Sequence, residues 1–287
     1  HINAIFVEDA NPLVQIDAGA GDEAGMAAHL DALPDWGSER EVNEYYVRTG
    51  LWAADAAVSA ANGQGAFLFW NHPSWSEQAP DGKPPISPQH QRWFSEKLLH
   101  GIEVVNGVSY SPESFQLAID NDLALIGTSD VHDLIDWDCL PELGGHRPVA
   151  LVFATSAQMT DVRAALFAKR TAVWFQDTLM GRERELAPLV KASIVVTSAH
   201  YLPETTLVQV RLENRSSVPF QLQNLSNFGD QNNPGPVTIP ALGALTLELA
   251  TGVRLAEISW PVRVVNAYTT PNTQLVITLS SSVADAE

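Results

Sequence analysis

The sequence changes character near residue 190, and this change sets the class of fold before any single motif is considered. Up to that point, apolar runs of strand length alternate with segments of helical pattern. Such alternation is typical of an α/β domain with a parallel sheet or barrel. Beyond it, short strand patterns are separated by Asn, Gly and Pro turns, and no helical pattern is evident. We therefore expect an α/β domain over residues 1–190 and an all-β, sandwich-like domain over residues 191–287.

The first part contains clear helix starts and strand runs. Two Ser-Pro pairs, Ser87-Pro88 and Ser111-Pro112, combine an N-cap residue with a proline suited to the first helical position. The continuous apolar run 66–71 is of the kind buried on both faces of a parallel sheet. The other expected strands of this part are 1–7, 102–106, 123–128, 149–154 and 171–176, and the other expected helices are 42–62, 157–169 and 182–189. The strands expected in the second part are 192–198, 206–213, 220–224, 242–250, 262–267 and 274–279.

The charge of the chain limits the class of partner. The sequence has 34 acidic and 16 basic residues, a formal net charge of −18. Such a surface repels nucleic acid and anionic membrane, so duplex nucleic acid is not an expected partner. A small anionic substrate would need a local positive centre, and a bound metal ion is the obvious source. Cys139 is the only cysteine, which excludes an intrachain disulfide and a cysteine-type metal site, and no apolar run is long enough to span a bilayer.

Two histidines lie directly after predicted strands, where α/β folds place their chemistry. His72 follows the strand Phe-Leu-Phe-Trp, and His132 follows the strand that ends in Gly-Thr. Asp130 and His132 alternate with Val131, so in an extended segment both side chains point to the same side. A carboxylate and an imidazole from one short segment form a suitable pair of ligands for Mn, Fe or Zn. A third ligand from another strand end would leave positions open for water and substrate.

Several segments of the first part resemble the PHP family, the polymerase and histidinol phosphatase metallohydrolases. The resemblance covers roughly residues 1–190, and the order, spacing and strand-end placement of the segments make it specific. The segments are the opening strand 1–6, the His-Pro pair at 72–73, the strand 101–107, the Ser-Asp-x-His motif ending at 132, and the helix–strand unit 164–171.

The resemblance implies a distorted (β/α)7 barrel with two or three divalent metal ions that hydrolyses phosphate esters. Position by position, it implies that His1, His72, Asp130 and His132 are metal ligands, and that Asp130 or His132 also moves a proton. The family's opening His-x-His, a further His and a metal-bridging Glu would lie upstream of His1, so the first strands of the barrel are expected to be missing from this chain. The remaining ligands are expected on a removed N-terminal segment or on a second chain.

The residues after His-Pro bear on the substrate. Some family members have a Gly-Arg pair there that clamps a terminal phosphate, whereas this chain has Ser74 and Trp75. Without the guanidinium a bidentate phosphate grip is lost, and Trp75 adds an apolar wall. This favours a phosphodiester of a small organic molecule over a monoester. Asn106 and Arg48 are further candidate substrate contacts, and the loop 74–87 is either a pocket wall or an ordinary surface loop.

The expected mechanism is in-line attack on phosphorus by a metal-bound hydroxide, with Mn, Zn or Fe as the candidate metals. Asp130 and His132 are the candidate catalytic residues, since either side chain can shuttle a proton. Glu103 lies in the middle of a predicted strand and is better explained as a buried partner than as a base. The aspartates at 133, 136 and 138 predict a solvated acidic loop.

Other functions stay open at this point. One is a phosphomonoesterase of the same fold, and another is a non-catalytic binding protein on a decayed hydrolase fold. A third is a copper oxidase that uses an N-terminal histidine, against which the α/β first part argues. The all-β part is expected to pack on the barrel or to mediate self-association into a homo-oligomer. A removed N-terminus and an added β-domain favour a periplasmic or secreted location.

Overall fold

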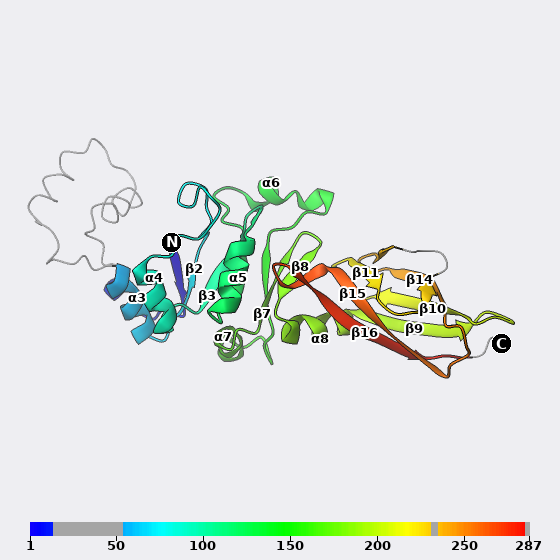
Figure 1. Cartoon of the computed structure of the whole chain (residues 1–287). Helices are drawn as coiled ribbons and strands as arrows, with labels where there is room; N and C mark the ends of the chain where they lie inside the picture. Colours follow the sequence, from blue (N-terminus) through cyan, green and yellow to red (C-terminus); the bar gives the residue numbers. More distant parts are fainter. Residues whose placement is uncertain (14–53, 231–234, 285–287) are drawn as a thin grey trace, which may run out of the picture. The chain divides into compact units, whose positions relative to one another are not determined.

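The computed structural model describes residues 1–13, 54–230 and 235–284 (Figure 1). The chain forms two compact units. The first comprises residues 1–70 and 86–100, and the second comprises residues 71–85 and 101–287. Residues 42–53 of the expected helix 42–62 lie outside the described residues, and Arg48 is among them.

The described part of the first unit combines an antiparallel strand pair with helices. Its elements are β1 (Ile2–Ile5), η1 (Asn11–Leu13), α3 (Ala54–Gly63), β2 (Phe67–Trp70) and α4 (Pro88–Ser95). β1 pairs antiparallel with β2, with Ile2 opposite Trp70 and Ile5 opposite Phe67. All four residues of β2 are buried, as the apolar run predicts.

Helix α4 begins where the first Ser-Pro pair predicts. The Ser87 hydroxyl accepts a hydrogen bond from the backbone N–H of His90, and the His90 ring accepts one from the backbone N–H of Ser87. This is a capping box with histidine in the place usually taken by Glu or Gln. The His90 ring also stacks on Trp70 at 4.2 Å between ring centroids. One side chain therefore both closes the helix start and packs against β2.

The second unit opens with a parallel strand–helix–strand arrangement. Its first elements are β3 (Gly101–Asn106), β4 (Ser109–Tyr110), α5 (Pro112–Asp120) and β5 (Ala124–Thr128). β3 and β5 pair in parallel, with Ile102 opposite Leu125. Helix α5 begins at Ser111, whose side chain accepts a hydrogen bond from Ser114, so the second Ser-Pro prediction is also confirmed. The carboxyl ends of β3 and β5 therefore lie at the same edge of the sheet.

The strands that follow depart from the expected parallel sheet. The next elements are α6 (Ile135–Cys139), η2 (Pro141–Leu143), β6 (Val149–Val152), α7 (Met159–Phe167), β7 (Thr171–Phe175), β8 (Thr178–Gly181) and α8 (Glu183–Ser193). β6, β7 and β8 pair antiparallel in sequence order. A two-residue turn joins β7 to β8, and Gln176 adopts the left-handed φ that such a turn requires. Alternation of strands and helices does not encode the direction of pairing, which is why the parallel prediction fails here.

The remaining strands form the expected all-β part. They are β9 (Ile194–Tyr201), β10 (Leu207–Asn214), β11 (Phe220–Asn224), β12 (Gly229–Asp230), β13 (Val237–Ile239), β14 (Ala244–Ala250), β15 (Glu257–Thr270) and β16 (Thr273–Ser282). One sheet has the order β12-β14-β10-β9. The other has the order β13-β11-β15-β8-β7-β6, with β16 on β15, so it continues into the strands before residue 190.

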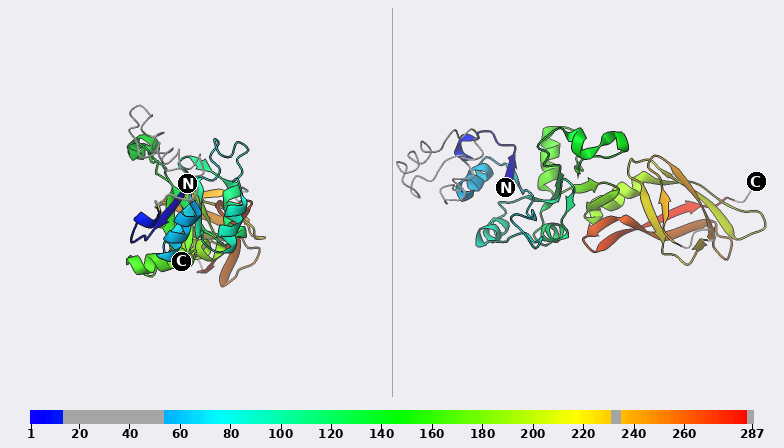
Figure 2. Two further views of the ribbon diagram at one scale, coloured as in Figure 1. Left: turned by 90° about the vertical axis from the view of Figure 1, so that its left-hand side faces the viewer. Right: turned by 90° about the horizontal axis from the view of Figure 1, so that it is seen from above.

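The core of the all-β part lies between these two sheets (Figure 2). Val208, Val210 and Leu212 of β10 are fully buried, and they alternate with residues that face outward. They share a core cluster with residues of β14, β15 and β16, among which Trp260 is the largest. The half-buried alternation predicted for the strand 206–213 is therefore confirmed.

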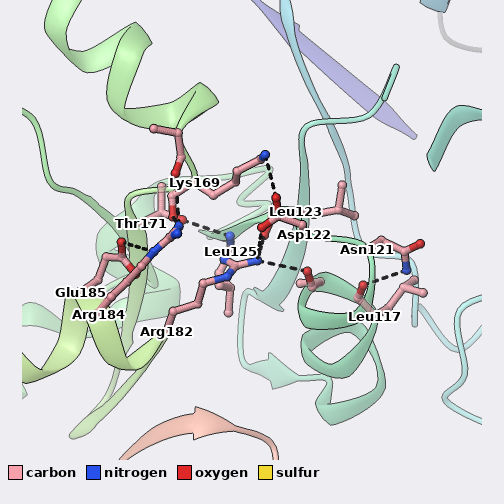
Figure 3. A network of polar contacts seen from close by, with 12 residues as sticks. Leu117, Asn121, Asp122, Leu123, Leu125, Lys169, Thr171, Arg182, Arg184 and Glu185 are labelled. Atoms are coloured by element: carbon pink, nitrogen blue, oxygen red, sulfur yellow. Dashed lines mark hydrogen bonds and ion pairs between the residues drawn. The ribbon is translucent and has the colours of Figure 1, made fainter. Parts of the chain in front are cut away.

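A polar network anchors the amino-terminal end of β5 (Figure 3). Arg182, just before α8, donates from Nη2 to the carbonyl oxygens of Leu123 at 2.8 Å and Ala118 at 3.2 Å. Lys169 Nζ bonds to the Asp122 carboxylate at 2.9 Å and lowers the pKa of that carboxyl. Cations at the end of α5 suit both the carbonyl groups there and the helix dipole. The network therefore fixes β5 at the end opposite to the one from which Asp130 and His132 follow.

None of the helices in the described ranges is long and apolar enough to cross a membrane.

Candidate active site

The buried carboxylate of Glu103 connects three segments at the carboxyl ends of β3 and β5. Glu103 is 2% exposed. Its Oε2 accepts hydrogen bonds from the His72 backbone N–H at 2.6 Å and from Asn106 Nδ2 at 3.1 Å. Its Oε1 accepts a hydrogen bond from the Thr128 hydroxyl at 2.6 Å. The interpretation of Glu103 as a buried partner is confirmed, and the structure shows what its partners are.

The environment of Glu103 acts on its pKa in two directions. Burial raises the pKa, because it disfavours the charged form. The hydrogen bonds from Thr128, the His72 backbone and Asn106 favour the carboxylate and oppose this shift, and burial prevails. All three donors suit a carboxylate, which has only acceptor sites.

His72 follows β2 by two residues and is 9% exposed. Its backbone lies in the left-handed region, with φ 30°. Burial lowers the pKa of its imidazole, and the carboxylate of Asp130 opposes that shift. A lowered pKa favours the neutral ring at neutral pH, which is the form that binds metal ions or accepts a proton. The Trp75 ring meets the His72 ring edge-on at 5.7 Å between centroids.

Asp130 and His132 follow the end of β5. His132 Nε2 lies 3.8 Å from Asp130 Oδ1, and their side chains are 76% and 42% exposed, respectively. Asp130 also has a left-handed backbone, with φ 48°. The structure therefore brings these two predicted ligands together on an accessible part of the surface. Asp130 is also close enough to His72 and Glu103 for its negative charge to act to raise the pKa of each of these two groups.

The donor atoms of this region suit a divalent transition metal, but the described residues do not form a complete metal centre. Two ligands that bind one ion at about 2.0–2.2 Å lie roughly 3–4 Å apart, a range that includes the Asp130–His132 separation. The Oδ1 atom of Asn71 is buried without a hydrogen-bond donor among the described residues, so an oxygen next to His72 is also available. Within residues 1–13, 54–230 and 235–284, however, no three His, Cys, Asp or Glu side chains are arranged to hold an ion.

The structure brings Asp130 and His132 together but does not complete a set of three ligands with His72, so the ligand role of Asp130, His132 and His72 stays a prediction. His1 lies in the first unit, directly before β1, and its role as a ligand also stays a prediction.

Two of the predicted substrate contacts, Trp75 and Asn106, lie in the second unit. The Trp75 side chain is 42% exposed. Trp75 begins a turn, in which its backbone carbonyl oxygen accepts hydrogen bonds from the backbone N–H groups of Gln78 and Ala79. Ala79 is buried, so this loop is packed onto the protein at that point. Asn106 lies at the end of β3, and its amide is bonded to Glu103. Their contact with substrate is untested and stays a prediction, as does that of Arg48.

The sequence interpretation missed some features of the site. It did not identify Thr128 or Asn71, and it treated 133–138 as a loop, whereas the structure has the short helix α6 there. The available signal for the buried cluster was Glu103 itself, since one acidic residue inside an apolar strand needs polar partners.

Comparisons with known proteins bear on both parts of the chain. Residues 194–280 match a family described as an Ig-like domain. The chain is similar to the crystal structure of a two-domain protein from Bacteroides vulgatus that contains a predicted PHP-like metal-dependent phosphoesterase. The identity is 28%, the TM-score is 0.77, and the match covers 98% of this chain and 71% of that one. The resemblance to the PHP family is confirmed. This PHP-like chain has a mixed α/β part followed by an Ig-like domain. No curated protein matches it.

Proposed function

We propose that this PHP-like chain takes part in metal-dependent hydrolysis of phosphate esters at the carboxyl ends of β3 and β5. The observation that supports this most directly is the Asp130–His132 pair, 3.8 Å apart, near a buried His72 with a lowered pKa. The similar protein from Bacteroides vulgatus contains a predicted phosphoesterase that depends on metal, which supports the same reaction class.

Each residue has a distinct part in the proposed reaction. Asp130, His132 and His72 would hold the metal, which we propose to be Mn, Zn or Fe. When bound, a divalent ion supplies charge that neutralises phosphoryl oxygens and lowers the pKa of water. His132 is accessible to solvent, and either His132 or Asp130 could give a proton to the leaving alcohol or take one from water while its side chain is not bound to the metal. Glu103 is buried and fully engaged, so it holds the site together and does not contact the substrate.

The charge around the site supports a phosphodiester as substrate. Residues 130–142, which follow the carboxyl end of β5, contain five Asp and Glu residues and no Lys or Arg. A monoester dianion therefore meets more repulsion here than a diester, which has one negative charge. Trp75 offers an exposed apolar surface beside His72 for an organic group of the ester. We also propose that the α/β part belongs to a distorted (β/α)7 barrel, for which the parallel pair β3–β5 is the support.

The test measures metal content and turnover on the purified protein after incubation with Mn²⁺, Zn²⁺ or Fe²⁺. Bis(p-nitrophenyl) phosphate and p-nitrophenyl phosphate serve as the diester and the monoester. We expect bound metal, faster cleavage of the diester, and loss of both metal and turnover in His132→Ala. His200→Ala, in strand β9 of the Ig-like domain, is the matched control and should behave as wild type.

Each other outcome would contradict a stated part of the proposal. Faster cleavage of the monoester would contradict the argument from Trp75 and the acidic surface. Retained metal and turnover in His132→Ala would contradict the role of His132. A protein that binds no metal and cleaves neither ester would support a non-catalytic binding protein on a decayed hydrolase fold.

A further inference from the structure

The hydrogen bonds of Glu103 connect parts of the chain that carry the predicted ligands. Its two oxygens accept three hydrogen bonds, and the donors come from the segment after β2, the end of β3 and the end of β5. The bond from the Thr128 hydroxyl is 2.6 Å long, which is in the range of charge-assisted O–H···O⁻ bonds, and the bond from the His72 N–H is also 2.6 Å long. Three segments that are distant in sequence are therefore fixed to one buried group.

Two of these segments have an unusual backbone at or next to the bonded residue. His72, whose N–H bonds to Glu103, has φ 30°, and Asp130, two residues after Thr128, has φ 48°. Positive φ values are uncommon in non-glycine residues, although Asp and His adopt them more readily than most, and hydrogen bonds to such a segment help to hold it in place. The hydrogen bond to Glu103 holds the backbone of His72 directly, and the bond from Thr128 holds the end of β5 two residues before Asp130.

We propose that Glu103 is the positioning residue of this site: its carboxylate fixes the backbone of His72 and the end of β5, and so sets the distance between the predicted ligands His72 and Asp130. This inference rests on the proposed function for its effect on turnover. The positioning itself is a property of the polypeptide and can be measured without any reaction.

Substitutions at Glu103 can distinguish a role in positioning the chain from a role that needs its negative charge, because the three donors differ in what they can bond to. In Glu103→Gln, the amide oxygen can accept from His72 and Asn106, and the amide nitrogen can donate to Thr128, because a hydroxyl group both donates and accepts. Glutamine can therefore keep all three contacts without a negative charge. Methionine has a similar size and keeps none of them.

The experiment compares Glu103→Gln with Glu103→Met, and Thr128→Ser with Thr128→Val, with the exposed Glu113→Gln as the control. The readouts are hydrogen exchange of the His72 amide, the affinity for Mn²⁺, and kcat and KM for bis(p-nitrophenyl) phosphate. We expect Glu103→Gln and Thr128→Ser to stay within about threefold of wild type. We expect Glu103→Met and Thr128→Val to exchange the His72 amide faster and to lose about 10–100-fold in Mn²⁺ affinity and kcat, with KM less affected.

Two results would overturn the proposal. If Glu103→Gln is as defective as Glu103→Met, the negative charge itself is required and Glu103 is not merely a positioning residue. If Glu103→Met exchanges the His72 amide and binds Mn²⁺ as wild type does, Glu103 positions nothing. Should Glu103→Met fail to fold, the Thr128→Ser and Thr128→Val pair decides by the same readouts. A wild-type protein without turnover would contradict the proposed function alone, since amide exchange still tests the positioning.

Discussion

Arg182 is the residue whose removal should cost the second unit the most stability among the charged side chains of the polar network. Its side chain is only 14% exposed, and its Nη2 donates to the carbonyl oxygens of Leu123 and Ala118. Replacement by Met keeps much of the length and leaves both carbonyl groups without this donor. Hydrogen bonds that involve a charged group contribute about 1.5–3 kcal/mol each, and burial of the guanidinium offsets part of that gain. We therefore expect Arg182→Met to lower the free energy of unfolding by about 2–5 kcal/mol.

Urea unfolding followed by circular dichroism measures this change. The free energy of unfolding of Arg182→Lys should lie between those of wild type and Arg182→Met, because a single ammonium group can reach one of the two carbonyl oxygens more easily than both. Arg215→Met is the control, since its side chain is 59% exposed and its partner Glu213 is 43% exposed, so the replacement should lower the free energy of unfolding by about 1 kcal/mol or less. A loss below about 0.5 kcal/mol in Arg182→Met would refute the reasoning, because it would mean that water replaces the guanidinium at both carbonyl groups without cost.

Three further predictions concern other parts of the molecule. His90→Ala should lower the free energy of unfolding by about 1 kcal/mol in the same urea titration. His90→Gln keeps an acceptor for the capping box, so its free energy of unfolding should fall by less. The hydrogen bond from Lys169 lowers the pKa of Asp122 from its usual 3.8, so its stabilising effect is present above that pH and is lost as the pH falls through the lower folded value. The melting temperature of Asp122→Asn should therefore fall less steeply than that of wild type between about pH 4 and pH 2, and equal slopes would contradict the role of the pair. Val210→Ala, in the core of the Ig-like domain, should lower the free energy of unfolding by about 2 kcal/mol. Gln209 faces outward next to it, so Gln209→Ala should lower the free energy of unfolding by less than about 0.5 kcal/mol.

Local signals in the sequence predicted local features of the fold well. Ser87 and Ser111 cap α4 and α5 as expected, because an N-cap and a following proline act within one helical turn. The placement of His72 and His132 after strands was also predictable, since a run of apolar residues marks a buried strand and the polar residue after it marks its end.

Features that depend on contacts between distant residues were not predictable. The antiparallel pairing of β6, β7 and β8 depends on where the chain re-enters the sheet, and no periodic pattern encodes that. The same holds for the site: the pattern shows that Glu103 needs partners, but the choice of His72 and Thr128 depends on how three segments meet. Most of the acidic segment 133–138 lies in α6 (Ile135–Cys139) although its charges suggest a loop, because a single helical turn needs little sequence preference.

The parallel contact between β8 and β15 has a consequence for any attempt to separate the two sequence halves. Ala267 and Tyr268 of β15 lie opposite Leu179 and Met180 of β8, so strands on either side of residue 190 share one hydrogen-bonded ladder. A fragment that stops at residue 190 would present β8 with bare amide and carbonyl groups, the kind of edge that recruits other chains into aggregates. Expression of either half alone therefore disrupts a sheet, and the recognisable Ig-like segment is not an interchangeable module.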